Sequence, residues 1–242
     1  MRRPIVLITT SVGGKIDEYA QAVSEAGGEP VRLDVDGAWI GALDVAHGLL
    51  VSGGVDVDPG RYGAPHSPLI EETDPGRDDF EIHLVRSARD HRVPTLCICR
   101  GLEVANVAFG GTLLADIPDA LGAGALPHER KRDGRNDRGL IDEHVVHIDA
   151  GTTLAGIVGK TELITGARHH QAIDRCADEL RIVARTADGI AEGLEAKFPS
   201  PFWLAVQWHP ESTRDLDDGA SRALFTAFAE AARLQAGQTL NR

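Results

Sequence analysis

Cysteine, basic charge and long apolar runs are all scarce in this chain of 242 residues. Three cysteines are too few for a disulfide framework, which favours a reducing compartment, and we expect a cytoplasmic protein. The 25 basic residues are outnumbered by 37 acidic ones, so the net charge of -12 argues against a nucleic-acid partner. No apolar run approaches the roughly 20 residues of a membrane span. The start, MRRPIVLITT, predicts a strand rather than a secretory signal.

The first half of the chain alternates between strand-like and helix-like segments. Helical spacing or charge pattern marks three of them, and the predicted strands between them are short, apolar and rich in β-branched residues. Such alternation predicts a parallel sheet with right-handed crossovers. The predicted strands are 4–10, 29–35, 47–54 and 93–99, and the predicted helices are 16–28, 77–91 and 102–110.

The second half predicts strands joined by short turns, and so antiparallel pairs, with Asp188-Gly189 as a tight turn. A closing amphipathic helix is predicted at 219–237. No repeat or clear linker interrupts the chain, and we expect one domain over 1–242. The predicted strands of this half are 144–150, 180–186, 189–196 and 203–209.

Cys97 and Cys99 stand at the end of a predicted strand, where a metal site, a core position and a nucleophile are alternatives. Paired zinc ligands are separated by two to four residues and need a second pair, but here the separation is one and Cys176 stands alone. His144 and His147 would point to opposite faces of a strand, so we expect no metal. A core position suits Cys97, which lies inside the strand.

Cys99 suits a nucleophile better, because it stands at a sharp turn from strand to helix. Such an elbow requires small residues two positions to either side, and these are Cys97 and Gly101. The helix start beside it favours a thiolate. His209 ends an apolar strand and Glu211 would point the same way, so Glu211 can orient the imidazole. A lone histidine at a strand end is more often structural, but beside an elbow cysteine we predict catalysis by these three residues.

Four stretches together resemble the class I glutamine amidotransferase family, and more narrowly its γ-glutamyl-γ-aminobutyrate hydrolase branch. They are RDDFEIHLVR at 77–86, ICRGLEVANVAFGGTLLADI at 98–117, HHQAIDR at 169–175 and AVQWHPE at 205–211. The resemblance implies a flavodoxin-like three-layer sandwich with a mostly parallel central sheet and an antiparallel portion in the C-terminal half. It also implies a Cys-His-Glu triad that cleaves γ-glutamyl amides, as in putrescine catabolism, through a γ-glutamyl thioester without a cofactor.

The same resemblance implies an oxyanion hole made of two backbone N–H groups. One follows the nucleophile, at Arg100, and the other comes from the glycine turn Ser52-Gly53-Gly54, at Gly54. A glycine turn lets backbone approach a substrate closely, so Gly53 is also a candidate binding residue. The alternative is that these glycines form a simple turn.

The chain departs from the family pattern at two places. Many members carry glycine where Cys97 stands, and close relatives often read Val-Asn-Ser where this chain has Thr165-Gly166-Ala167 before Arg168. Arg168 is a candidate to bind a substrate carboxylate, or else a solvated surface charge. His170 and Gln171 are candidate pocket residues or merely structural ones.

The expected partner is a small-molecule γ-glutamyl amide, with no nucleic acid and no membrane. The charged stretch 122–143 is predicted to be a surface loop, either a lid over the site or an irrelevant insertion. Three other functions stay open: a glutaminase subunit that delivers ammonia to a synthase, a silent binding protein of the same fold, and a γ-glutamyl transferase. A homodimer is an option that the sequence leaves open.

Overall fold

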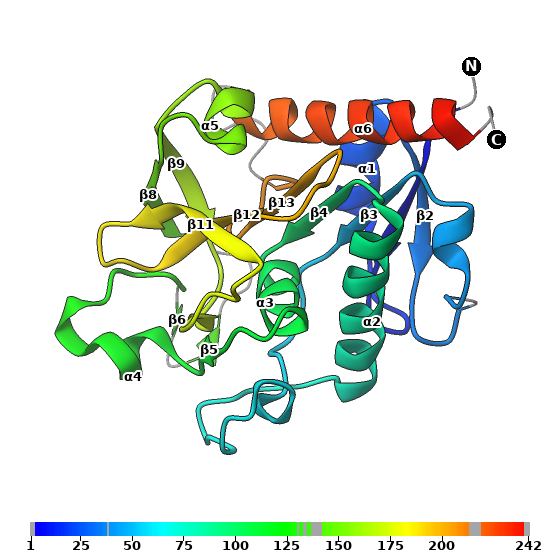
Figure 1. Ribbon diagram of the computed structural model, residues 1–242. Helices are drawn as coiled ribbons and strands as arrows, with labels where there is room; N and C mark the ends of the chain where they lie inside the picture. Colours follow the sequence, from blue (N-terminus) through cyan, green and yellow to red (C-terminus); the bar gives the residue numbers. More distant parts are fainter. Residues whose placement is uncertain are drawn as a thin grey trace.

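The computed structural model describes residues 3–37, 39–129, 131–132, 135–136, 142–212 and 219–239 (Figure 1). The strands are β1 (Ile5–Thr9), β2 (Glu29–Leu33), β3 (Gly48–Val51), β4 (Thr95–Ile98), β5 (Leu113–Leu114), β6 (Lys131–Arg132), β7 (Arg135–Asn136), β8 (Asp142–Ile148), β9 (Glu162–Ala167), β10 (Ala172–Ile173), β11 (Leu180–Thr186), β12 (Ala191–Ala196) and β13 (Trp203–Val206). The α-helices are α1 (Asp17–Glu25), α2 (Pro75–His91), α3 (Arg100–Ala108), α4 (Ile117–Leu121), α5 (Thr153–Val158) and α6 (Ala220–Thr239). Short 3₁₀ turns are η1 (Ala42–Asp44), η2 (Pro59–Tyr62) and η3 (Gly122–Gly124).

One central sheet runs through the described residues in the order β2-β1-β3-β4-β13-β12-β11-β8-β9. The five strands from β2 to β13 pair in parallel, and the pairs from β13 to β9 are antiparallel. The predicted parallel sheet with an antiparallel portion in the C-terminal half is therefore confirmed. The turn at Gly189 joins β11 to β12, and its φ of +88° suits glycine.

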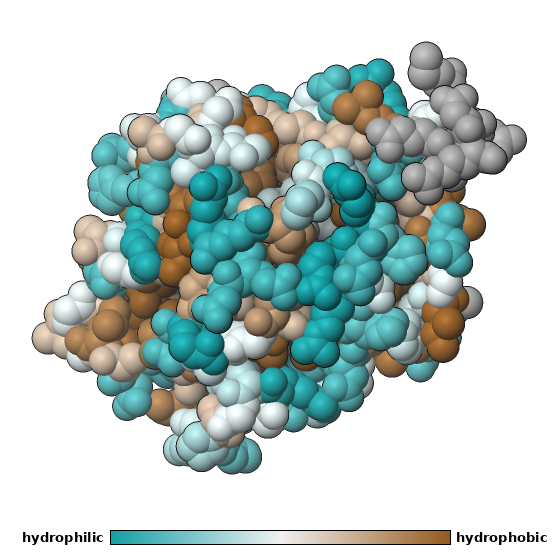
Figure 2. All heavy atoms as spheres, in the orientation of Figure 1, coloured by the Kyte–Doolittle hydropathy of each residue, from teal (hydrophilic) through white to brown (hydrophobic). Residues whose placement is uncertain are grey.

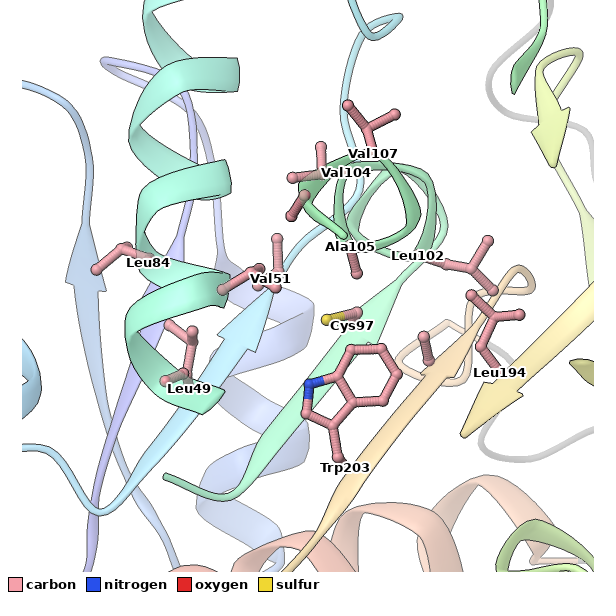
Figure 3. Packing of buried hydrophobic residues seen from close by; sticks show 14 of the residues in the cluster. Leu49, Val51, Leu84, Cys97, Leu102, Val104, Ala105, Val107, Leu194 and Trp203 are labelled. Atoms are coloured by element: carbon pink, nitrogen blue, oxygen red, sulfur yellow. The ribbon is translucent and has the colours of Figure 1, made fainter. Parts of the chain in front are cut away.

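The central strands are apolar on both faces, because helices cover each side of the sheet. Leu49, Val51 and Cys97 face a core shared with α2 and α3, and Figure 3 shows Cys97 between Val51 and the start of α3. Leu50 and Leu96 point the other way, toward α1 and α6. Figure 1 shows α6 running along the opposite side of the sheet from α2. These are the three layers of the predicted sandwich.

Helix α2 begins two residues earlier than the pattern predicted. Pro75 occupies its first turn, where its missing N–H costs nothing, and the Asp74 carboxylate accepts a hydrogen bond of 3.0 Å from the Arg77 N–H. Polar side chains of α2 cover part of the molecular surface, where Figure 2 shows a hydrophilic band. Three charged residues of α2 turn inward instead, and they reappear at the site below.

The sequence patterns missed several short elements. β9 pairs antiparallel with β8 at the sheet edge, and β5 pairs with β10 in a separate ribbon. The predicted loop 122–143 contains η3 and the short pair β6–β7, and its residues 130, 133–134 and 137–141 lie outside the described residues. Among the helices that the structure describes, none combines the length and apolar character needed to span a membrane.

Candidate active site

Cys99 lies at the junction of β4 and α3 in a backbone conformation that side chains rarely adopt. Its φ is +54° and its ψ is −114°, and within the described residues only Arg92 shares a positive φ without being glycine. Such a conformation costs roughly 1–3 kcal/mol and persists where the surroundings enforce it. The Cys99 carbonyl accepts a hydrogen bond of 2.8 Å from the Leu102 N–H, which starts the helix directly behind the sulfur. This is the geometry of a nucleophile elbow.

The small neighbours of the elbow are required by packing. A Cβ placed on Gly101 would lie 2.2 Å from the carbonyl oxygen of Val51, so the first turn of α3 contacts the end of β3 without room for a side chain. Cys97, on the other side, is fully buried in the core, and burial raises the pKa of its thiol. The core position predicted for Cys97 is confirmed, and the free cysteines Cys97 and Cys99 belong to different core clusters.

His209 and Glu211 form a charge-assisted hydrogen bond, as the spacing predicted. His209 Nδ1 lies 2.6 Å from Glu211 Oε1, which leaves Nε2 for a second partner. Burial works against a charged ring, but the charges of Glu211 and Cys99 and hydrogen bonds to both raise the pKa of His209 to about 10. The imidazolium is therefore the favoured form at neutral pH, where it can pair with a thiolate.

The glycine turn after β3 lies against both residues. A Cβ on Gly53 would lie 3.0 Å from His209 Cε1 and 3.6 Å from Cys99 Cβ, so only glycine lets the backbone come this close. The Gly53 N–H donates to the Tyr19 hydroxyl over 3.1 Å. Across the part of the chain that the structure describes, the amides of Gly54 and Arg100 have no acceptor. These two donors remain available for an oxyanion.

A buried ion network, which the sequence patterns did not reveal, holds this turn. The Arg77 guanidinium donates to the Gly53 carbonyl over 3.0 Å and to the Ser52 hydroxyl over 3.0 Å. Its Nε donates to Glu81 over 2.9 Å, and the Arg100 guanidinium joins Glu81 to Asp78. The network therefore links the glycine turn to the Arg100 side chain, next to the nucleophile. Its members are Arg77, Asp78, Glu81 and Arg100, each at most 2% exposed.

A pocket of about 460 Å³ opens over the cysteine, and every predicted site residue lies along its wall. The wall carries the carboxylates of Glu71 and Glu72 and the cations Lys15 and Arg168. The structure thus brings together the predicted residues from four separate parts of the chain. The predicted residues are Gly53, Gly54, Cys99, Arg100, Arg168, His170, Gln171, His209 and Glu211.

The tentative binding residues are held by specific partners. Arg168 is half-buried rather than a fully solvated charge, and it donates to the Ser212 hydroxyl over 2.9 Å. His170 Nε2 lies 2.9 Å from Asp56, and burial notwithstanding, the hydrogen bond and charge of Asp56 raise the pKa of His170 to about 9. The Gln171 side-chain oxygen accepts from the Val57 N–H over 2.9 Å. These hydrogen bonds therefore fix the positions of His170 and Gln171 in the pocket wall.

Three further residues at the site were not predicted. Gln207 donates to Glu103 over 3.0 Å, and its amide lies 3.8 Å from the Cys99 sulfur. Burial, followed by the charges of Glu211 and Cys99, raises the pKa of Tyr19, so its phenol stays neutral beside the glycine turn. Gln207 stands in the AVQWHPE stretch and could have been found there, whereas no motif in the sequence around Tyr19 indicates a role at the site.

The chain is similar to known proteins over most of its length. The Peptidase C26 family model matches residues 10–211. The chain is 40% identical over 225 residues to Rv2859c of Mycobacterium tuberculosis, provisionally named a glutamine amidotransferase, covering 91% of this chain and 68% of the relative. It is 29% identical over 224 residues to the γ-glutamyl-γ-aminobutyrate hydrolase PuuD of Escherichia coli, covering 89% of this chain and 85% of the relative.

A solved structure from Thermoplasma acidophilum, provisionally named as one component of a GMP synthase, shares the fold. It superposes with a TM-score of 0.69 over 98% of both chains at 18% identity. Since the family model matches most of the chain, the conclusion follows that this protein belongs to the Peptidase C26 family of class I glutamine amidotransferase-like proteins.

Proposed function

We propose that this protein is a cysteine hydrolase that cleaves the γ-glutamyl amide bond of γ-glutamyl amines to glutamate and a free amine. The observation that carries the proposal is the nucleophile elbow at Cys99. The backbone of Cys99 is strained at the start of a helix, and the residue lies beside the imidazole of His209, whose Nδ1 is hydrogen-bonded to Glu211. That combination supplies a thiolate and a general acid in one place.

The proposed reaction begins with attack of the Cys99 thiolate on the γ-carbonyl carbon. The oxygen of the tetrahedral intermediate takes up the negative charge and accepts hydrogen bonds from the amides of Gly54 and Arg100. His209 donates its proton to the departing amine as the C–N bond breaks, which leaves a γ-glutamyl thioester. His209 then removes a proton from water, the hydroxide attacks the thioester, and the thiolate is released with glutamate.

The size and charge of the pocket support a substrate larger than glutamine. A volume of about 460 Å³ lies within the range of pockets that hold drug-sized ligands. Arg168 offers a cation for a carboxylate on the leaving amine, and the PuuD relative is named for a leaving group of that kind. Glu71 and Glu72 would instead favour a cationic amine. The substrates that test the proposal should therefore differ in the charge of the leaving amine.

The test is steady-state hydrolysis of a panel comprising glutamine, γ-glutamyl-γ-aminobutyrate and γ-glutamyl-putrescine. The Cys99→Ala variant should lose turnover, and the matched Cys97→Ala variant should keep it, because Cys97 packs in the core. Retained turnover by Cys99→Ala would refute the proposed nucleophile. Folding of both variants is checked by circular dichroism.

A second candidate is a glutaminase that passes ammonia to a partner synthase. It is favoured by the provisional name of the relative with 40% identity. This candidate predicts that glutamine is the best substrate of the panel, and that hydrolysis by the isolated chain is slow and rises with a partner. Faster hydrolysis of γ-glutamyl amines than of glutamine by the isolated chain would favour the first proposal.

A further inference from the structure

A second group of titratable side chains adjoins the pocket wall and takes no part in the proposed reaction. Its members come from four segments: the stretch before β6, strand β8, the turn after β9, and strand β12. All are at least nine-tenths buried, with exposed fractions of 3%, 6%, 5% and 0% in chain order. This histidine cluster consists of His128, His144, His169 and Glu192.

The ligand atoms of His128, His144 and Glu192 all lie within 4.8 Å of one another, as around one metal ion, and His169 adjoins two of them. Glu192 Oε1 lies 3.4 Å from His169 Nε2, 3.6 Å from His144 Nε2 and 3.7 Å from His128 Nδ1. His128 Nδ1 and His169 Nε2 are 3.3 Å apart. Zinc bonds of about 2.0–2.1 Å place tetrahedral ligand atoms about 3.3–3.4 Å from one another. Most of these separations are too long for good hydrogen bonds and close to those of a tetrahedral shell.

The outer nitrogens of two rings are held in the way that metal-binding imidazoles usually are. His128 Nε2 lies 3.0 Å from the Asp188 carboxylate, and His169 Nδ1 lies 2.9 Å from the Gln171 carbonyl oxygen. Asp188 is itself fixed by the Thr186 hydroxyl at 2.5 Å. A proton on each outer nitrogen turns the lone pair of the inner nitrogen toward the centre.

The centre of the cluster holds polar atoms with no hydrogen bond among the described residues. They are both carboxylate oxygens of Glu192 and both ring nitrogens of His144, all buried. A buried carboxylate without hydrogen bonds is costly. Protonated imidazoles would supply charge but leave these bonds unmade, whereas a divalent cation would satisfy the carboxylate and the inner nitrogens together.

We propose that the histidine cluster binds one zinc ion as a closed, structural site. Three imidazoles and one carboxylate are a donor set that suits Zn²⁺. Because all four ligands come from the protein and are buried, no position is left for substrate. The ion would join strands β8 and β12 to the segments of His128 and His169, and His169 also lines the pocket. This inference departs from the expectation of no metal, and it does not depend on the proposed hydrolase activity.

The test uses the Cys99→Ala protein, so that zinc cannot bind the reactive thiol and lost hydrolysis is not the readout. Purified protein is stripped with a chelator, incubated with zinc and dialysed, and its metal content is measured by elemental analysis. We expect one zinc per chain and a higher Tm with zinc than without. A Co²⁺-substituted sample should show the d–d bands of a tetrahedral site without a thiolate charge-transfer band.

Variants locate the ion. In the same background, Glu192→Gln and His144→Gln should each weaken zinc binding at least tenfold in calorimetric titration. His147→Gln is the matched control, because its side chain is 55% exposed on the same strand, and it should bind like the parent. Absence of stoichiometric zinc in the Cys99→Ala protein would overturn the proposal, even if a cluster variant fails to fold. Unchanged affinity in Glu192→Gln would overturn it as well.

Discussion

The contact between His209 and Glu211 leads to a prediction that can be worked out quantitatively. Glu211→Gln keeps the shape of the side chain but removes its charge from a 2.6 Å hydrogen bond. A hydrogen bond to a charged group is worth about 1.5–3 kcal/mol, which corresponds to roughly a tenfold to hundredfold change in an equilibrium. We therefore expect the equilibrium that keeps His209 protonated beside Cys99 to weaken by that factor in the variant.

The assay is the rate of Cys99 alkylation by iodoacetamide as a function of pH, in a Cys176→Ser background because Cys176 is only half-buried. At pH 7 the Glu211→Gln protein should react roughly ten to a hundred times more slowly. Glu18→Gln is the control, since Glu18 lines the same pocket but bonds Ser212. Equal rates in wild type and Glu211→Gln at pH 7 would refute the reasoning.

The free energy of unfolding should also depend on pH, through the pKa of His209. The folded-state pKa of His209, about 10, lies above the usual value of 6.5, so the folded protein binds the extra proton between these limits. The stabilisation is fully present below pH 6.5 and is lost as the pH rises through 10. The free energy of unfolding of wild type should fall over this window, and it should fall less in Glu211→Gln. Denaturant titrations at several pH values measure the difference.

Two further pairs of substitutions test the scaffold of the site. Glu81→Gln breaks the buried ion network and should lower the free energy of unfolding by about 3–5 kcal/mol, whereas Glu179→Gln, at a surface pair, should cost below about 1 kcal/mol. Gly101→Ala forces a Cβ to within 2.2 Å of the Val51 carbonyl and should cost about 1–3 kcal/mol together with most of the turnover. Gly156→Ala, in open space within α5, should be neutral or stabilising by up to about 1 kcal/mol. Chemical denaturation measures all four, and equal costs within either pair would contradict the packing argument.

Local patterns were sufficient to predict the sheet and the turn at Cys99. Strand-helix alternation predicts parallel pairing by a general rule, and the small residues beside Cys99 are required because α3 starts against β3. The short spacing of His209 and Glu211 made their contact predictable from the backbone alone. β9 was missed because its sequence, ELITGA, has only two large apolar residues in a row and contains a glycine.

Contacts between distant segments could not be predicted in this way. Arg77 and Glu81 lie on a helix that the sequence predicts without saying which side chains turn inward, and they are buried because Arg100 and the glycine turn supply partners. His144 was considered only with its neighbour His147, which indeed points away. Its true neighbours are 16, 25 and 48 positions away in the chain, and no spacing rule connects them.

The central claim is that the Cys99 sulfur carries the γ-glutamyl group during turnover. Mass spectrometry of protein quenched in acid during hydrolysis of a γ-glutamyl amine measures this directly. We expect one γ-glutamyl adduct, on the peptide that contains Cys99, at a position lost in Cys99→Ala. An adduct on Cys176, or turnover without any adduct under conditions that trap a thioester, would contradict the account.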